Sequence, residues 1–263
     1  MGCSHLAFKG DVMSGHSKWA SIKHKKAATD AKRGRVFTKL IREISVASRT
    51  GGGDPDSNSR LRTAITAAKR INMPADNIKR AVKKGTGELP GAAFEEAVFE
   101  GYGPGGVALM MEVATDNRNR TISELRHILT RNGGNMGENG CVSWMFNKKG
   151  YIVVPQKGVD EEILMNLALE AGADDMSEDS DNWEIFSTPK SYTQVLEAVR
   201  GADITVETSE IAMIPQSHVE ISGKPAQHML KLMEELEDHE DVQNVYANFD
   251  IEEVEMQALT EAR

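Results

Sequence analysis

Apolar residues recur every three to four positions over residues 36–47, where they line one side of a helix. Three glycines followed by Asp54 and Pro55 end that pattern, and a second helix begins near Ser57 or Asn58. Pro74 opens a third, shorter helix that Gly85 closes. Three helices with one apolar stripe each predict a small helical bundle near the start of the chain.

Beyond the bundle, from about residue 92, the pattern changes to alternating strands and helices. Residues 94–101 and 107–115 read as a strand pair joined by a glycine-rich turn, and a helix follows over 118–132. A glycine-rich loop over residues 133–140 then leads into a short apolar run at 141–146, which predicts a further strand. This part of the chain therefore reads as a mixed α/β structure.

Residues 149–214 carry their apolar runs in the order β-α-β-β-α-β, which is the ferredoxin-like arrangement. A β-α-β pattern resumes after Pro215, and the pieces on either side of the insert look incomplete alone. The predicted fold class is therefore α+β with three domains, in which a ferredoxin-like domain is inserted into an α/β domain that follows a three-helix bundle. The expected boundaries are 1–12 (leader or cloning remnant), 13–91 (basic helical domain), 92–148 plus 215–251 (α/β domain), 149–214 (ferredoxin-like domain) and 252–263 (C-terminal tail).

Charge separates the bundle from the rest of the chain. Residues 13–85 contain 18 Lys or Arg and 5 Asp or Glu, a net charge of +13, whereas residues 86–263 contain 12 and 34, a net charge of −22. Residues 1–12 add one charge of each sign, so the whole chain carries −9. A short basic run is usually a solvated helix face, but an excess over this length favours a polyanionic partner.

The composition also narrows the class of protein. No apolar run approaches the roughly 18 residues that a membrane span requires, and two cysteines suit a reducing cytoplasm. Residues 101–106 match G-x-G-x-x-G formally, but a strand follows them, so a hairpin turn is the better interpretation. The carboxylates and scattered histidines complete no catalytic or metal-binding pattern. We therefore expect a cytoplasmic protein that is not an enzyme, with no membrane partner, cofactor or metal.

Two polar segments contain charged or aromatic residues that folding alone does not explain. In residues 15–35, Trp19 lies among cations, an arrangement in which the ring stacks on an unpaired base, although it equally suits packing on the bundle. In residues 115–121, Asp116 or Asn117 caps a helix, and two arginines are left over to hold a phosphate. The predicted nucleic-acid-binding residues are His16, Lys18, Trp19, Lys23, His24, Lys25, Lys26, Lys32, Arg33, Arg35, Lys39, Arg118 and Arg120.

The chain resembles the YebC/PmpR family over residues 13–251. The motifs that carry the resemblance are GHSKW at 15–19, IKHKK at 22–26, DAKR at 30–33, FTKLIREI at 37–44, GGGDP at 51–55, NMP at 72–74, YGPGG at 102–106, TDNRNRT at 115–121 and QNVY at 243–246. The resemblance implies the same three domains. It also implies a DNA-binding transcriptional regulator of the bacterial cytoplasm, although relatives include a mitochondrial translational activator and proteins linked to ribosomes stalled on proline-rich nascent chains.

Three functions follow from these observations. A DNA-binding transcriptional regulator explains the basic bundle, and a ribosome-associated translation factor that binds ribosomal RNA explains it as well. An enzyme acting on nucleic acid is disfavoured because no catalytic constellation is present. We predict binding without catalysis, with DNA or ribosomal RNA as the partner, the ribosome as a further candidate partner, and no assignment of the oligomeric state.

Overall fold

The computed structural model describes residues 30–91, 93–179 and 181–261. By their contacts, residues 145–217 form one unit, and the described residues before and after them form a second. Among the described residues, no helix is both long enough and apolar enough to span a bilayer.

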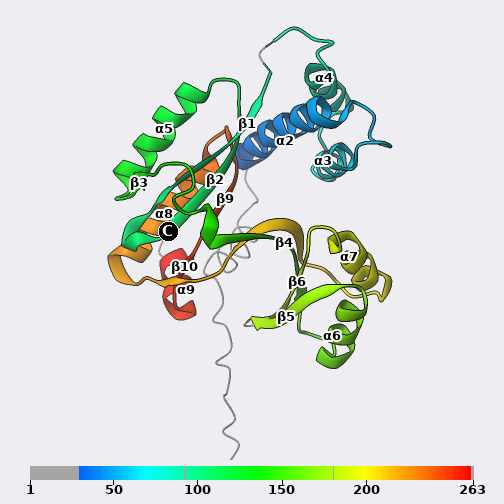
Figure 1. Ribbon diagram of the computed structural model, residues 1–263, viewed down its shortest axis with the longest axis vertical. Helices are drawn as coiled ribbons and strands as arrows, with labels where there is room; N and C mark the ends of the chain where they lie inside the picture. Colours follow the sequence, from blue (N-terminus) through cyan, green and yellow to red (C-terminus); the bar gives the residue numbers. More distant parts are fainter. Residues whose placement is uncertain (1–29, 92, 180, 262–263) are drawn as a thin grey trace, which may run out of the picture. The chain divides into compact units, whose positions relative to one another are not determined.

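Three helices pack around an apolar core at the start of the second unit (Figure 1). Their apolar stripes meet, so that Ile44 of the first helix, Leu61 of the second and Ile78 of the third are buried in one cluster. Asn58 stabilises the connection between the first two helices. Its side chain accepts a hydrogen bond from the backbone N–H of Leu61 and donates one to the backbone carbonyl of Ala47 in the first helix. The helices are α2 (Asp30–Gly51), α3 (Ser59–Arg70) and α4 (Ala75–Gly85).

Helices α2 and α4 approach each other closely at Gly85. A Cβ atom at this position would overlap the carbonyl oxygen of Ser45 and lie 2.7 Å from the Cβ of Ser48. We expect Gly85→Ala to push the two helices apart and lower the free energy of unfolding by about 1–3 kcal/mol, measured by urea denaturation. Gly34→Ala is the control, because that position in α2 has open space around it and alanine favours a helix. Equal stability of the two variants would contradict the close approach.

The α/β part of this unit is a four-stranded sheet in the order β3-β1-β2-β9. Figure 1 shows β9, from near the end of the chain, beside β2 from its first half. Helices α5 and α8 bury Leu125, Leu129 and Met229 in one cluster with alternate residues of β2, Leu109 and Met111. These elements are β1 (Glu95–Tyr102), β2 (Ala108–Thr115), α5 (Arg118–Arg131), β3 (Asn135–Met136), α8 (Gly223–Asp238) and β9 (Val242–Ala247).

Short elements complete the unit around this sheet. A parallel pair joins β8 (Val219–Glu220) to β10 (Phe249–Asp250). A 3-10 turn, η1 (Pro104–Gly106), connects β1 to β2. The segment expected as a tail contains helix α9 (Glu253–Glu261), which buries Met256 against the main core.

The glycine-rich loop ends in a clamp rather than in the strand predicted at 141–146. The buried carboxylate of Glu100 accepts hydrogen bonds from the backbone N–H groups of Gly140, Val142 and Ser143, with N–O distances of 2.7–2.8 Å. Because these donors point at one carboxylate, they are not available to a neighbouring strand, and residues Ser143–Met145 form the 3-10 turn η2 instead. The strand prediction over 141–146 was therefore wrong, and the strand begins at Phe146.

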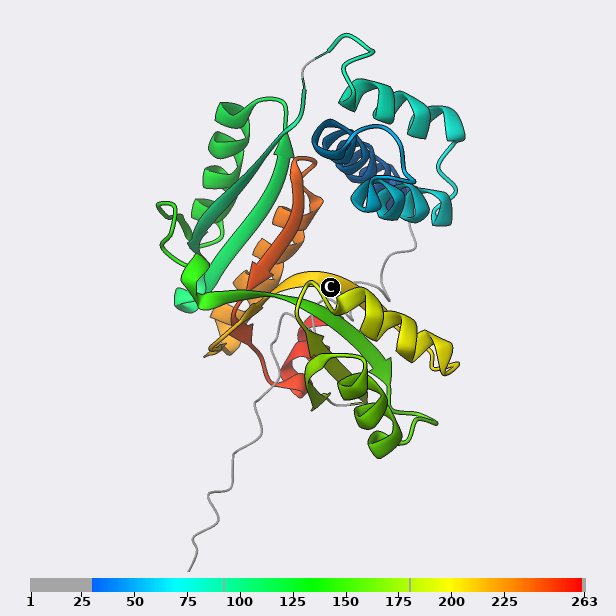
Figure 2. The same cartoon turned by 45° about the vertical axis from the view of Figure 1, so that its right-hand side comes forward.

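The unit formed by residues 145–217 has a four-stranded antiparallel sheet in the order β5-β6-β4-β7. Two helices cover one face of it (Figure 2), where Leu164 and Val195 pack on Ile152 and Ile185 of the central strands. The elements are β4 (Phe146–Pro155), α6 (Glu161–Glu170), β5 (Ala173–Asp179), β6 (Asn182–Ser187), α7 (Tyr192–Gly201) and β7 (Thr208–Pro215). This is the β-α-β-β-α-β order of the ferredoxin-like arrangement, so the predicted fold class is confirmed.

Candidate nucleic-acid interface

Only some of the predicted nucleic-acid-binding residues lie in the part of the chain that the structure describes. Seven of its residues lie outside the described part of the chain: His16, Lys18, Trp19, Lys23, His24, Lys25 and Lys26. Lys32 and Arg33 belong to the first turns of α2, but their side chains are not among those described. Arg35, Lys39, Arg118 and Arg120 can be placed with their side chains.

Arg35 and Lys39 of α2 reach the C-terminal end of α8. The Nε atom of Arg35 lies 3.2 Å from a carboxylate oxygen of Asp238. The Nζ atom of Lys39 donates to the backbone carbonyl of Glu237 at 2.6 Å. That carbonyl belongs to the last turn of α8, where the helix dipole is negative and the carbonyls lack partners within the helix. Both predicted cations therefore already have acceptors within the chain.

The two arginines at the start of α5 differ in their surroundings. Asn117 caps this helix by accepting the backbone N–H of Arg120 at 3.1 Å, as one of the two predicted caps. The Arg120 side chain donates to Asp116 at 2.9 Å and to Asp241 at 3.1 Å. The exposed Arg118 has its guanidinium carbon 5.6 Å from the ring centre of Phe99. A phosphate clamp here stays a prediction, and Arg120 would have to share its donors with two carboxylates.

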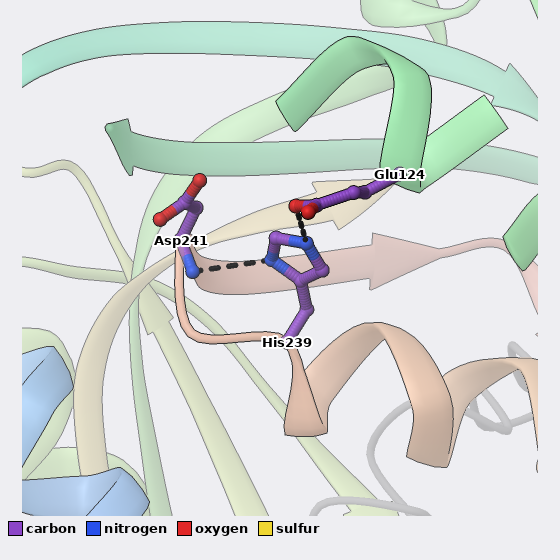
Figure 3. A group of neighbouring side chains, drawn as sticks. All are labelled: Glu124, His239 and Asp241. Carbon is purple, nitrogen blue, oxygen red and sulfur yellow. Dashed lines mark hydrogen bonds and ion pairs between the residues drawn. The ribbon is translucent and has the colours of Figure 1, made fainter. Parts of the chain in front are cut away.

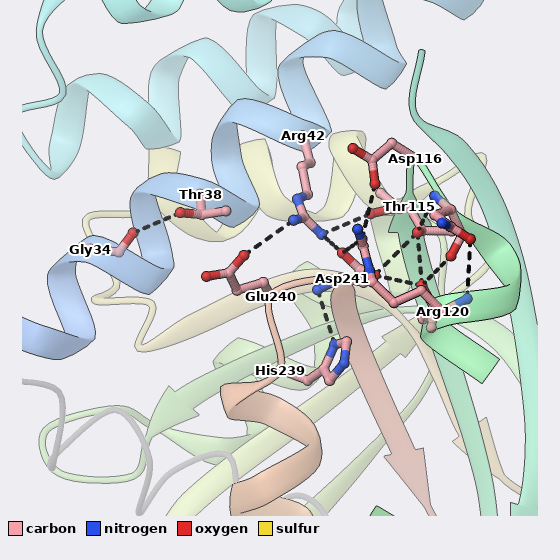
Figure 4. A network of polar contacts seen from close by, with 12 residues as sticks. Gly34, Thr38, Arg42, Thr115, Asp116, Arg120, His239, Glu240 and Asp241 are labelled. Carbon is pink, nitrogen blue, oxygen red and sulfur yellow. Dashed lines mark hydrogen bonds and ion pairs between the residues drawn. The ribbon is translucent and has the colours of Figure 1, made fainter. Parts of the chain in front are cut away.

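Asp241, directly before β9, connects the bundle to the sheet (Figure 4). One carboxylate oxygen accepts from Arg42 of α2, and the other accepts from Arg120 and from the hydroxyl groups of Thr115 and Thr121. Arg42 also donates to the carbonyl of a β2 residue at 3.2 Å. Burial alone would raise the pKa of Asp241, but the hydrogen bonds from Thr121, Arg120 and Arg42 outweigh it and lower the pKa to about 2. The carboxylate is therefore charged at neutral pH and holds α2 against the sheet.

Glu124, His239 and Asp241 lie close enough together to suggest a metal site (Figure 3). The atoms that would bind an ion already have partners, however. His239 Nδ1 accepts the backbone N–H of Asp241 at 3.1 Å, and Nε2 lies 3.0 Å from the Glu124 carboxylate. Asp241 faces two guanidinium groups, which would repel a cation. This arrangement suits a structural network better than a metal centre.

A second group of cations, on α3 and α4, has no such partners in the described part of the chain. Exposed side chains at the end of α3 and along α4 make no hydrogen bond or ion pair with any residue that the structure describes. On α4 they occupy positions i, i+1 and i+4, opposite the buried Ile78 and Ala81, so they share one solvent-facing side. We call these five residues the α3–α4 cations: Lys69, Arg70, Lys79, Arg80 and Lys83.

The sequence-based site did not include the α3–α4 cations. Their position opposite the apolar stripe of α4 was a readable signal, because a helix that buries one face exposes the other. The sequence pattern could not show that these cations are more available to a ligand than the cations of α2. That ranking depends on the acidic partners that α2 finds in α8, which are distant in sequence.

The thiol near the glycine-rich loop does not indicate catalysis. Cys141 is half-buried, and burial together with the negative charge of Glu100 raises the pKa of its thiol. A raised pKa keeps the thiol protonated at neutral pH, whereas a catalytic cysteine needs a thiolate.

Comparisons with known proteins agree with this architecture. Residues 17–88 match the model of the TACO1/YebC protein N-terminal domain, and residues 94–249 match that of the TACO1/YebC second and third domain. A probable transcriptional regulatory protein of Acidobacterium capsulatum is 59% identical over 92% of this chain and 98% of its own. One of Geobacter sulfurreducens is 59% identical over 94% of this chain and 100% of its own.

A solved structure shows the same fold. The crystal structure of a conserved hypothetical protein from Aquifex aeolicus is 51% identical, with a TM-score of 0.79, over 90% of this chain and 98% of that one. The resemblance identified from the sequence motifs is thus confirmed, and the chain belongs to the TACO1/YebC family.

Proposed function

We propose that this protein is a non-catalytic regulator of gene expression that binds duplex DNA through its helical bundle. The observation that carries the proposal is the row of α3–α4 cations, which are exposed and lack acidic partners among the described residues. Similar proteins named probable transcriptional regulatory proteins support DNA as the target. The proposal includes a cytoplasmic location, where a bacterial chromosome lies.

The electrostatics of the bundle suit this role. Residues 34–91 contain 12 Lys or Arg and 5 Asp or Glu, so this stretch carries a net charge of +7. A cluster of unpaired cations attracts the phosphate backbone and releases its counterions, and this term supplies most non-specific binding energy. The acidic remainder of the chain would be repelled by DNA, which favours an orientation with the bundle toward the duplex.

The length of the connection between α3 and α4 is compatible with binding to duplex DNA. Four residues, 71–74, separate the two helices, and Asn72 among them has a positive φ of 58°. A turn of three to four residues between two helices is the length found in helix-turn-helix motifs. In such motifs the second helix faces the major groove. Here the second helix is α4, which carries three of the five α3–α4 cations.

Replacing all five α3–α4 cations with glutamine tests the proposal. We expect the slope of log K against log salt to become shallower by about 0.9 for every phosphate of a short DNA duplex that the variant no longer neutralises. Fluorescence anisotropy with labelled duplex, over roughly 50 to 200 mM salt, measures both affinity and slope. Single-stranded RNA of matched length is measured in parallel.

The control variant removes the same number of positive charges, but from outside the bundle. It replaces five exposed cations outside the bundle, Arg126, Lys148, Lys157, Lys190 and Lys224, with glutamine. If both variants weaken binding equally, net charge and not the α3–α4 cations explains the effect, and the proposed interface is wrong. If wild-type protein binds the RNA but not the duplex, the target is RNA instead.

A further inference from the structure

An acidic segment of the chain already occupies part of the cationic surface of α2. Four of the five residues 237–241 are acidic, and they include the end of α8 and the turn before β9. Arg35, Lys39 and Arg42, spaced four and three residues apart on one side of α2, all contact this segment. We call residues 237–241 the acidic turn.

The contacts between α2 and the acidic turn differ in how far their side chains are exposed to solvent. Arg42 and Asp241 are both buried, with side chains 9% and 2% exposed, and removing either would leave a charge without its partner. The Arg35–Asp238 pair is much more open, with side chains 35% and 47% exposed. Exposed ion pairs contribute little and exchange partners readily. The inner pair therefore anchors α2, while the outer cations can be released.

The outer contacts resemble those that a phosphate would make. A guanidinium group binds carboxylate and phosphate oxygens in the same way, and an ammonium group that donates to a helix carbonyl can also donate to a phosphate oxygen. Asp238 and Glu240 are moreover exposed, and the Glu240 side chain is 69% exposed. Their negative charges repel any phosphate that approaches this side of α2.

We propose that the acidic turn is an intramolecular competitor for phosphate. It holds Arg35 and Lys39 in the free protein, and the two cations exchange these acceptors for DNA phosphates on binding, while the Arg42–Asp241 pair stays in place. The inference rests on the proposed function, because it requires the bundle to bind DNA. Its consequence is that the acidic turn limits affinity in the intact protein and that neutralising the turn strengthens binding.

The first experiment neutralises the exposed carboxylates with Asp238→Asn and Glu240→Gln together. We expect the dissociation constant for a short DNA duplex to fall roughly three- to tenfold. The salt slope should change little, because the same cations contact phosphate in both complexes. The control pair is Glu220→Gln with Glu252→Gln, two exposed residues of the same unit with no described side-chain contact to α2. It makes the same change in net charge.

The second experiment places Arg35→Gln with Lys39→Gln in the wild-type chain and in the neutralised chain. If the acidic turn competes with DNA, the decrease in affinity is several-fold larger in the neutralised chain, where Asp238 no longer pairs with Arg35 and less negative charge opposes phosphate beside Lys39. Circular dichroism checks that all variants fold.

The outcomes separate the inference from the function on which it rests. Equal gains from the neutralised pair and the control pair, with wild-type protein still binding duplex, overturn the competitor and leave the proposed function intact. Equal decreases in the two backgrounds overturn it as well. Absence of duplex binding by every variant, including wild type, refutes the proposed function and the inference together.

Discussion

Replacing Asp241 with alanine is expected to lower the free energy of unfolding by about 3–5 kcal/mol, because the change leaves a buried guanidinium without its counter-charge. Arg42 is 7% exposed, and among the described residues it would keep as acceptors only the Ala114 carbonyl and the exposed carboxylate of Glu240. Thr121 would lose an acceptor in the same place. Chemical denaturation with urea measures the decrease in stability.

The matched control is Glu240→Ala, the neighbouring acid, whose side chain is 69% exposed and which lies 3.4 Å from Arg42. An exposed pair of this kind contributes about 0–1 kcal/mol, so the control is expected to be nearly as stable as wild type. Similar destabilisation of the two variants would show that burial of the Asp241 network does not determine stability.

The same carboxylate makes stability depend on pH. The pKa of Asp241 is about 2 in the folded protein, below its ordinary value of 3.8. A lowered folded pKa contributes stability above the unfolded pKa, and that contribution is lost as the pH falls from about 4 to 2. The difference corresponds to roughly 2–3 kcal/mol. Asp241→Asn should therefore show a flatter decline in stability over this range, and an unchanged decline would contradict the assignment.

Replacing Glu100 with glutamine is expected to release the end of the glycine-rich loop. A glutamine side chain offers one acceptor oxygen and a donor group, so at least one of the three backbone N–H groups loses its acceptor and the others lose a charged one. We expect a destabilisation of about 2–4 kcal/mol, concentrated in this loop. Amide hydrogen exchange at Gly140, Val142 and Ser143 should accelerate by about 30- to 1,000-fold if the loop opens locally.

Glu138→Gln is the control for the loop, since it removes an exposed carboxylate from the same segment. Its exchange rates should match those of wild type. Burial raises the pKa of Glu100, but the three N–H groups outweigh it and hold the pKa below its ordinary value. Protection of the loop should therefore weaken on acidification in wild type but not in Glu100→Gln. Identical pH dependence in both proteins would refute the clamp.

Local sequence predicted most of the elements correctly. The apolar stripe predicted over 36–47 is the buried side of α2 from Phe37 onward, whereas Val36 is 42% exposed. Asn117 caps α5 as one of the two residues proposed for that position. These signals are local, because helix periodicity and caps involve residues a few positions apart. The predicted strand at 141–146 failed for a non-local reason, namely that Glu100, forty residues earlier, binds the backbone there.

The candidate site shows the same division. The excess of positive charge in the bundle is a property of composition and could be read directly. The sequence could not show which cations are available to a ligand, because ion-pair partners such as Arg42 and Asp241 lie 199 residues apart in the chain. The partners of Arg35 and Lys39 are equally distant, while the α3–α4 cations have none among the described residues.

The sequence by itself thus determined most of the helices and strands, the inserted ferredoxin-like order and the basic character of the bundle, because each follows from short-range patterns or from composition. Only the tertiary structure decided which cations are paired, because ion pairs form between elements that folding brings together from opposite ends of the chain.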